Sequence, residues 1–334
     1  MNKLKIGITS GDTNGIGLEV ILKALSSEDI RLKADFYIFS SREIIAIHQK
    51  ILTNAVIPLF KVQPGGELEP GAIGLCDPWD RSFDIQFGIQ NDVGGIAAFD
   101  SLDFACDSIE RKKIDALVTA PLCKSNIPQL KYKDFKGHTA YLANRFNANT
   151  IMIMAADQTR VALASDHIPL SEISKTTDAS YLNKKIDEFN IALKFDFGIS
   201  NPKIAILGLN PHAGDDGIIG LEEINTILPI IEAKKKEGIN AFGPFPSDSF
   251  FGKKLYLNFD GVLAIYHDQG LIPFKMLYFE SGVNNTCGLP FVRTSPDHGV
   301  AFDIAGQNLA DETSFRESIF HAIKRTQLRQ ENTI

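Results

Sequence analysis

One local pattern recurs along the chain: a short apolar run, a turn rich in Gly, Pro, Asn or Asp, and a stretch with helical spacing. The first example runs from residues 4–9 through Ser10-Gly11-Asp12 into residues 16–25. Strands that alternate with helical stretches are typical of βαβ units and a largely parallel sheet. Ligands bind outside the carboxyl ends of such strands, so the residues just after each run are candidate site residues. The other predicted strands are 35–40, 115–119, 151–155, 160–164, 203–209 and 262–266, with a helix near 43–53.

Composition narrows the class of protein. A length of 334 residues predicts about two domains at roughly 150 residues each. The 34 Lys and Arg residues against 41 Asp and Glu residues give a net charge of −7, which argues against binding to nucleic acid but not to one small anion. No apolar run approaches the length of a membrane span, so no membrane partner is expected. The four cysteines form no C-x-x-C pair, which indicates a reducing compartment and predicts a cytoplasmic location.

Three histidines directly follow predicted strands. His167, His212 and His267 come after residues 160–164, 203–209 and 262–266. In a parallel sheet they meet at one edge, and three neutral imidazoles with an open fourth position suit a catalytic divalent metal. Asp166 and Asp268 stand beside two of them and can orient a ligand ring. The alternative is that each histidine is a hydrogen-bonded structural residue. The remaining His48 and His321 are expected at the surface or on helices.

A second group of residues suits an anion. His138 and Thr139 open a helical stretch, where a hydroxyl and free backbone N–H groups can bind phosphate or carboxylate. The alternative for Thr139 is an ordinary helix cap. Lys275 has apolar neighbours, so it either faces the anion or extends to the surface. Asn284 and Arg293 are close in sequence, and arginine is the natural bidentate partner of an anionic substrate.

The glycine-rich segment 11–17 matches no dinucleotide or P-loop motif, so a standard Rossmann domain is not supported. It is either a tight turn or a turn whose backbone faces the site. The Gly- and Pro-rich segment 63–87 is expected to be an excursion with short antiparallel strands.

Taken together, these segments resemble the 4-hydroxythreonine-4-phosphate dehydrogenase family of vitamin B6 (pyridoxal phosphate) biosynthesis. The run Gly288-Leu289-Pro290-Phe291-Val292-Arg293-Thr294-Ser295, followed by Asp297-His298-Gly299, is the most specific part of the resemblance. The other matching segments are 9–19, Ala120-Pro121 with Lys124, 137–139, 166–170, 208–214, 266–270 and 282–287.

The resemblance implies an α/β fold like that of the isocitrate and isopropylmalate dehydrogenases, with two α/β/α subdomains, a cleft between them and no standard Rossmann fingerprint. One domain, residues 1–130 plus 297–334, would carry the cofactor loop. The other, residues 131–296, would carry the metal ligands and the dimer contacts.

The resemblance also implies roles for individual residues. A divalent metal ion (Zn, Mg or Co) would be held by His167, His212 and His267, contributed by both subunits of a homodimer. Substrate binding falls to His138, Thr139, Lys275, Asn284 and Arg293, and acid–base catalysis to Lys275, Asp248 and His138. The loop 298–306 resembles the adenosine-binding loop of the related dehydrogenases, which assigns NAD or NADP to His298, Gly299, Asp303 and Gly306.

The implied reaction is the metal- and NAD(P)-dependent oxidation of 4-phosphooxy-L-threonine to a β-keto acid, which decarboxylates to 3-amino-2-oxopropyl phosphate. The alternatives are a dehydrogenase of erythronate or threonate 4-phosphate and a non-catalytic phosphosugar-binding or metal-storage protein. The sequence departs from the family pattern in three places: at residues 10–14, at Ser165-Asp166 and at Gln307-Asn308. The last two leave the choice between NAD and NADP open.

Overall fold

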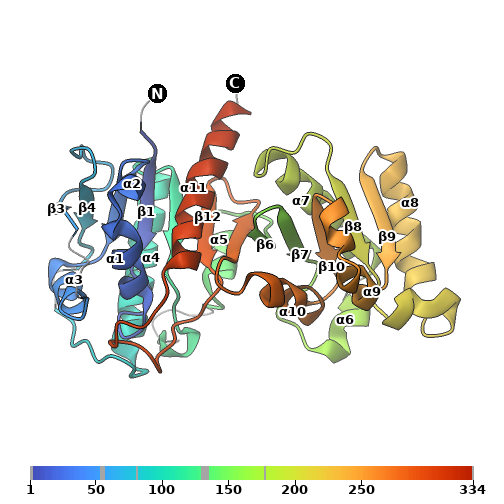
Figure 1. Cartoon of the computed structure of the whole chain (residues 1–334), viewed down its shortest axis with the longest axis horizontal. Helices are drawn as coiled ribbons and strands as arrows, with labels where there is room; N and C mark the ends of the chain where they lie inside the picture. Colours follow the sequence, from blue (N-terminus) through green and yellow to red (C-terminus); the bar gives the residue numbers. More distant parts are fainter. Residues whose placement is uncertain (1–2, 53–56, 80–81, 129–134, 177, 333–334) are drawn as a thin grey trace. The chain divides into compact units, whose positions relative to one another are not determined.

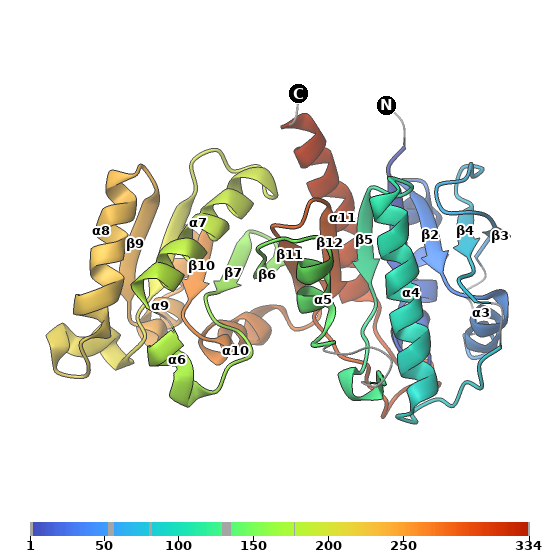
Figure 2. The same ribbon diagram turned by 180° about the vertical axis from the view of Figure 1, so that it is seen from behind.

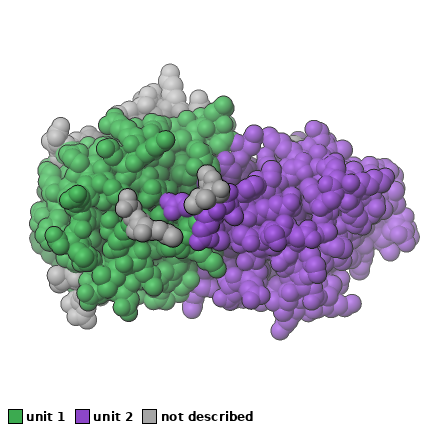
Figure 3. Space-filling model, turned by 90° about the horizontal axis from the view of Figure 1, so that it is seen from above, with its two compact units in different colours: residues 1–148, 289–327 green, residues 149–288, 328–334 purple. Residues whose placement is uncertain are grey.

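The computed structural model describes residues 3–52, 57–79, 82–128, 135–176 and 178–332. The chain divides into two compact units (Figure 3). Unit 1 comprises residues 1–148 and 289–327, and unit 2 comprises residues 149–288 and 328–334. The sequence places these divisions near residues 130 and 297.

Unit 1 is a parallel β-sheet with helices on both faces (Figures 1 and 2). In sheet order its strands are β3 (Leu59–Lys61), β4 (Ile73–Cys76), β2 (Asp35–Phe39), β1 (Lys5–Thr9), β5 (Ala116–Thr119) and β12 (Val292–Pro296). Its helices are α1 (Gly17–Ser26), α2 (Glu28–Arg31), α3 (Arg42–Gln49), α4 (Asp92–Glu110), the short η1 (Lys124–Asn126), α5 (His138–Arg145) and most of α11 (Thr313–Glu331).

Side-chain alternation along the strands explains this layering, because successive residues of a strand point to opposite faces. Ile6 and Ile8 of β1 pack in one buried cluster with residues of α1 and α11. Tyr37 and Phe39 of β2 pack in another cluster with residues of α4 and α5. Figure 2 shows α4 and α5 together on one side of the sheet, as the second cluster requires.

Unit 2 is a mixed sheet, also with helices on both faces. In sheet order its strands are β11 (Val283–Cys287), β6 (Ile151–Ala156), β7 (Thr159–Leu163), β10 (Gly261–Ala264), β8 (Lys203–Leu207) and β9 (Asn240–Phe245). Its helices are α6 (Leu170–Thr176), α7 (Ala179–Phe195), η2 (Pro211–Gly217), η3 (Glu223–Ile227), α8 (Leu228–Lys236), α9 (Ser247–Gly252), η4 (Leu255–Asn258) and α10 (His267–Tyr278).

The strands that precede the three histidines are neighbours in this sheet. β7, β10 and β8 run parallel to one another, whereas β6 runs antiparallel to β7 and to β11. One sheet face packs against α7 and α8, and the other packs against α9 and α10. The carboxyl ends of β7, β10 and β8 therefore lie at one edge.

The predicted α/β fold is confirmed, and two details differ from prediction. Within segment 63–87, β4 pairs in parallel with both β2 and β3, so the expected antiparallel pairing is wrong. All four residues of β4 are buried, as suits a strand between two parallel neighbours. The helix predicted at 43–53 is α3, which ends at Gln49, and residues 53 and 80–81 lie outside the described residues.

None of the helices in the described part of the chain combines the length and the apolar composition needed to cross a lipid bilayer.

Candidate active site

Two of the predicted metal ligands, His167 and His267, come together in unit 2. Their ring centroids lie 6.0 Å apart. The hydroxyl of Ser165 donates to the Ile265 carbonyl at 2.7 Å, and the Ser165 N–H donates to the same oxygen at 3.1 Å. These bonds join the chain just before each histidine. Of the three histidines predicted to meet at the sheet edge, these two therefore lie together.

Each of the two histidines has a carboxylate beside its Nδ1 atom. Asp268 Oδ1 lies 2.7 Å from Nδ1 of His267, and Asp166 Oδ2 lies 3.2 Å from Nδ1 of His167. The hydrogen bond from His167 lowers the pKa of Asp166 to about 2, which keeps that carboxylate charged. A carboxylate at Nδ1 favours the tautomer that leaves Nε2 free as a ligand, the arrangement common around metal-binding histidines. Both rings are therefore of a kind that can ligate a divalent metal ion, and they supply two of the three predicted ligands.

His212 lies on a left-handed turn that follows β8. The φ angles of His212, Ala213, Asp215 and Asp216 lie between 44° and 53°. Such angles are unfavourable for residues other than glycine, and they persist where surrounding contacts impose them. Within the described ranges, no group of three or more His, Cys, Asp or Glu side chains is arranged to hold a metal ion. The structure thus places His212 at the predicted strand end without bringing all three histidines into one cluster.

The buried carboxylate of Glu223 supports this turn. It accepts hydrogen bonds from the Asn210 backbone N–H at 2.7 Å and from the Asn210 side-chain amide at 3.0 Å. A Cβ atom on Gly208 or Gly214 would lie 3.2 Å and 2.7 Å from the Glu223 carboxylate, so both glycines make room for it. The sequence did not indicate Glu223, because its partner Asn210 lies 13 residues away along the chain.

Gln269 is a second buried side chain that the sequence did not indicate. Its Oε1 accepts from the Ile265 N–H at 2.6 Å, and its Nε2 donates to the Gly208 carbonyl at 2.5 Å and to the Ser247 hydroxyl at 2.8 Å. These partners stand at the ends of β10 and β8 and at the start of α9. Gln269 therefore fixes the segments that carry His267, His212 and Asp248.

The other predicted residues of unit 2 lie on separate elements. Asn284, on β11, has a buried Oδ1 atom without a hydrogen-bond partner among the described residues, while its amide nitrogen lies 3.4 Å from Met152 Sδ. An unsatisfied buried acceptor of this kind suits a polar ligand. Lys275 is half-buried on α10, and Asp248 is exposed in the first turn of α9.

Unit 1 carries the predicted anion-binding residues. Arg293, 3% exposed on β12, donates from Nε and Nη2 to the Thr119 hydroxyl at 3.1 Å and 2.6 Å. Burial lowers the pKa of Arg293 to about 9. Burial, together with the positive charges of Arg293 and Lys124, holds the pKa of His138 well below its ordinary value. His138 is therefore a neutral imidazole close enough to two cations to feel their charge, and such a setting favours an anion.

Thr139 lies half-buried in the first turn of α5. The alternative that Thr139 is the N-cap residue of this helix is wrong. The N-cap residue is Gly137, at φ 118°, and no side chain among the described residues caps this end. A Cβ atom at Gly137 would lie 2.8 Å from Cε of Lys124. Lys124 thus lies across the start of the helix, a position that sequence reasoning noted only as part of the family resemblance.

The predicted cofactor loop packs against the glycine-rich segment of unit 1. The Ile16 N–H donates to the Val300 carbonyl at 3.1 Å, and a Cβ atom at Gly15 would lie 2.1 Å from Val300 Cγ1. The glycines thus permit close approach of this loop rather than forming only a tight turn. Gly299 and Asp303 are exposed, and nothing lies within 4 Å of a Cβ atom placed on Gly299. Of the remaining predicted residues, His298 is half-buried with Nδ1 3.0 Å from the Gly299 carbonyl, and Gly306 is half-buried at φ 78°.

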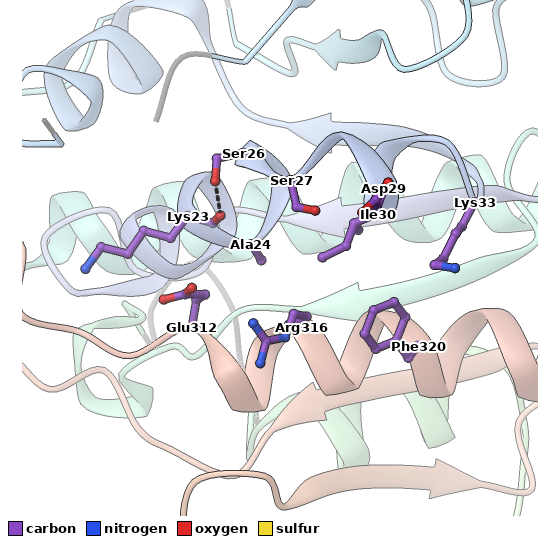
Figure 4. A pocket seen from close by; sticks show the side chains of 10 residues that line it. All are labelled: Lys23, Ala24, Ser26, Ser27, Asp29, Ile30, Lys33, Glu312, Arg316 and Phe320. Carbon is purple, nitrogen blue, oxygen red and sulfur yellow. Dashed lines mark hydrogen bonds between the residues drawn. The ribbon is translucent and has the colours of Figure 1, made fainter. Parts of the chain in front are cut away.

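A cavity of about 330 Å³ in unit 1 lies apart from these residues (Figure 4). It opens between α1–α2 and α11, and its lining includes none of the predicted site residues. The lining residues are Lys23, Ala24, Ser26, Ser27, Asp29, Ile30, Lys33, Glu312, Arg316 and Phe320.

Comparison with known proteins extends across the chain. Residues 33–322 match the family model described as pyridoxal phosphate biosynthetic protein PdxA. A 4-hydroxythreonine-4-phosphate dehydrogenase from Bacteroides thetaiotaomicron is 42% identical over 324 residues, which cover 96% of this chain and 88% of that protein. A protein named as a candidate D-threonate 4-phosphate dehydrogenase, from Oceanobacillus iheyensis, is 37% identical over 324 residues, covering 96% and 97%.

The fold agrees with a solved relative. The crystal structure of 4-hydroxythreonine-4-phosphate dehydrogenase from Klebsiella pneumoniae matches with a TM-score of 0.84 at 30% identity, covering 98% of this chain and 100% of that one. The resemblance inferred from the motifs is thereby confirmed. The chain belongs to the family of the pyridoxal phosphate biosynthetic protein PdxA.

Proposed function

We propose that this chain oxidises 4-phosphooxy-L-threonine with NAD or NADP, giving a β-keto acid that decarboxylates to 3-amino-2-oxopropyl phosphate in pyridoxal phosphate biosynthesis. The observation that carries the proposal is the pairing of His167 and His267, each backed by a carboxylate, in a member of this family. A phosphosugar-binding protein without catalysis has no need of such a pair.

His167, His212 and His267 would hold one divalent metal ion, with Zn, Mg and Co as the candidates. When bound, the ion would supply Lewis-acid polarisation of the hydroxyl group on the substrate carbon that is oxidised. Asp166 and Asp268 hold two of the rings through Nδ1. Gln269 holds the backbone from which His267 projects.

Recognition of the substrate's charged groups falls to unit 1 residues. Arg293, Lys124 and the first turn of α5 supply positive charge and N–H donors for phosphate or carboxylate. Neutral His138 and the Thr139 hydroxyl supply directional hydrogen bonds. In unit 2, Asn284 offers its unsatisfied Oδ1 to the substrate's ammonium group.

Proton transfer is assigned to Lys275 and Asp248, with His138 as a third acid–base candidate. Lys275 and Asp248 are reachable from solvent, since one is half-buried and the other exposed. The loop 298–306, with His298, Gly299, Asp303 and Gly306, is assigned to the nicotinamide cofactor. The choice between NAD and NADP is left to measurement.

A homodimer completes the proposal. Exposed apolar side chains flank two of the metal-ligand segments: Met276 at 83% and Phe279 at 74% near α10, and Ile218 at 81% after the His212 turn. Apolar exposure of this extent marks an interaction surface. A second copy that covers it would bring its own histidines to the site. The cytoplasm is proposed as the location, since all four cysteines are free thiols, which is typical of proteins in a reducing compartment.

The test is a substrate comparison with purified protein. Cofactor reduction is followed with NAD or NADP, a divalent metal salt, and each of 4-phosphooxy-L-threonine, threonate 4-phosphate and erythronate 4-phosphate. We expect the highest kcat/KM with 4-phosphooxy-L-threonine, together with release of carbon dioxide. Faster reduction with threonate 4-phosphate would favour the activity for which the Oceanobacillus iheyensis relative is named. Ligand binding without cofactor reduction would overturn the enzymatic proposal.

A further inference from the structure

We infer that Glu19 and Lys23 of α1 are positioning residues that set the affinity of the chain for its nicotinamide cofactor. The inference rests on the proposed function, because it assumes that the loop 298–306 binds that cofactor. Neither residue touches the assigned loop residues directly. Their contacts are with Asn308 and Ala310, which follow the loop directly.

Three acceptors surround the Lys23 ammonium group in the described part of the chain. Lys23 Nζ donates to the Ala310 carbonyl at 2.7 Å, the Asn308 carbonyl at 3.2 Å and Glu19 Oε1 at 2.8 Å. An ammonium group has three donors, so these bonds use all of them. Lys23 is therefore not available to bind a cofactor phosphate and acts only through the loop.

Glu19 completes the clamp from the preceding turn of the helix. Its Oε1 also accepts a hydrogen bond from the Ala310 N–H at 2.8 Å. The Glu19 side chain is 4% exposed and that of Lys23 is 19% exposed. Hydrogen bonds between charged groups are stronger when they are shielded from water. The pair thus holds both backbone groups of Ala310.

The loop needs external anchors because it has no regular structure of its own. Residues 297–312 contain neither helix nor strand, and Ala301 and Asn308 have φ angles of 46° and 60°. Its first part is held by the hydrogen bond from Ile16 to Val300, just before α1 begins. Residues 308–310, just after the loop, are held by Glu19 and Lys23 on the same helix. One rigid helix therefore spans both anchors and fixes the distance between them.

A matched control lines the same cavity. In Figure 4 the Lys23 side chain points away from Lys33 and Phe320, which lie at the opposite end. The Lys33 ammonium group lies 6.0 Å from the Phe320 ring centre, on α11 rather than on the loop. Lys33→Met removes a lysine charge from this cavity and leaves the loop anchors in place.

The experiment compares wild type, Lys23→Met and Lys33→Met by titration with NADH, followed by its fluorescence, and by steady-state kinetics. We expect Lys23→Met to weaken NADH binding and to raise the KM for cofactor by about tenfold. The KM for substrate should change less than twofold, and Lys33→Met should match wild type. Glu19→Gln, which keeps an acceptor at the same place, should lie between wild type and Lys23→Met, and it replaces Lys23→Met if that variant does not fold.

The outcomes separate the two proposals. If wild type binds NADH and Lys23→Met binds it equally well, the positioning role is overturned, even if the variant melts at a lower temperature. An equal rise in the KM for cofactor and the KM for substrate would also overturn it, because a general loosening of the fold would weaken the binding of both. If wild-type protein binds neither NADH nor NADPH, the cofactor assignment itself fails.

Discussion

At the scale of single residues, His48 is a histidine whose burial keeps it neutral. It lies on α3, as expected for a helix residue, but it is 1% exposed rather than at the surface. Its Nε2 lies 2.9 Å from the Thr13 carbonyl, and its ring packs edge-on against Phe87 at 4.9 Å. Burial lowers the pKa of His48 to about 4. His48 therefore supports the glycine-rich segment as a neutral residue.

This burial predicts a pH dependence of stability. The unfolded state takes up a proton near pH 6.5 and the folded state only near pH 4, so the free energy of unfolding falls as the pH drops through this window. Between pH 7 and pH 5 the loss assigned to His48 is about 2 kcal/mol. Urea unfolding at both pH values should show a smaller loss in His48→Gln than in wild type. Ala46→Gln, an exposed change on the same helix, should behave like wild type, and equal losses in all three would contradict the assignment.

Gly95 is a residue whose missing side chain lets two elements touch. A Cβ atom there would lie 1.8 Å from the Asn126 carbonyl oxygen and 2.2 Å from its carbon. The clash is with backbone of η1, which also carries Lys124. Gly95→Ala should lower the free energy of unfolding by about 3 kcal/mol, measured by urea titration. Gly252→Ala is the control, because nothing lies within 4 Å of its Cβ position, and it should change stability by less than about 1 kcal/mol. If Gly95→Ala and Gly252→Ala changed the free energy of unfolding equally, the close approach of Asn126 would not be the reason for a glycine at position 95.

At the scale of elements, the single side chain of Gln269 ties α10 to the ends of β10 and β8 and to the start of α9. Gln269→Met keeps the volume of Gln269 but leaves the Ile265 N–H and the Gly208 carbonyl without that partner. We expect about 2 kcal/mol lower stability, because an unpaired buried polar group costs about 1–3 kcal/mol. We also expect about tenfold weaker metal binding, since His267 is only two residues away.

Calorimetric titration with Co²⁺ checks the metal effect, and urea unfolding checks the stability effect. Gln158→Met, in the exposed turn between β6 and β7, is the matched control. Unchanged Co²⁺ affinity in Gln269→Met would separate Gln269 from the metal site and leave it a purely structural residue.

The elements that carry the histidines were predictable, whereas the side chains that hold them were not. An apolar run followed by a polar residue is visible in the sequence, so β7, β8 and β10 were located to within two residues at their ends. β10 ends before Ile265 because that N–H bonds to Gln269 instead of a strand. The Gly208 carbonyl, which accepts a hydrogen bond from Gln269, lies 61 residues away along the chain, and only the folded sheet brings the two residues together. The same holds for β4, whose parallel pairing depends on partners far along the chain.

The candidate site itself was predicted in part. The order of the histidines and their carboxylate neighbours can be read from the sequence, and the meeting of His167 with His267 follows from the parallel pairing of β7 with β10. The sequence did not indicate the left-handed turn at His212, because positive φ angles at non-glycine residues depend on tertiary contacts such as those of Glu223. The roles in metal, substrate and cofactor binding stay predictions.

At the scale of the whole molecule, the net charge of −7 conceals positive groups held inside. Arg293 is buried in unit 1 with neutral His138 close enough to feel its charge. An acidic exterior with such a cationic interior favours small anions that fit inside and disfavours extended polyanions. The exposed apolar residues near α10 and after the His212 turn are the other whole-molecule feature, and they carry the proposal of a dimer.

If the proposed site is shared, two inactive variants should rescue each other. His212→Ala and His267→Ala each remove one proposed ligand, so each alone should lose metal binding and nearly all activity. When the two chains are co-expressed, a mixed dimer in which His212 and His267 of one site come from different copies retains one intact site. Random pairing makes half of the dimers mixed, with one of two sites intact, so activity should return to about a quarter of wild type.

Distinct affinity tags isolate the mixed dimer, and its bound metal is measured alongside its activity. A mixture of His212→Ala with His212→Ala of the other tag is the control and should stay inactive, because every site lacks the same ligand. Met276→Glu in both copies should reduce the dimer seen by sedimentation, whereas Leu309→Glu, an exposed apolar position in unit 1, should not. A stable mixed dimer of His212→Ala and His267→Ala that binds no metal would mean that one chain supplies both histidines. The site would then have to close within a single copy, by a movement of the His212 turn toward His167 and His267.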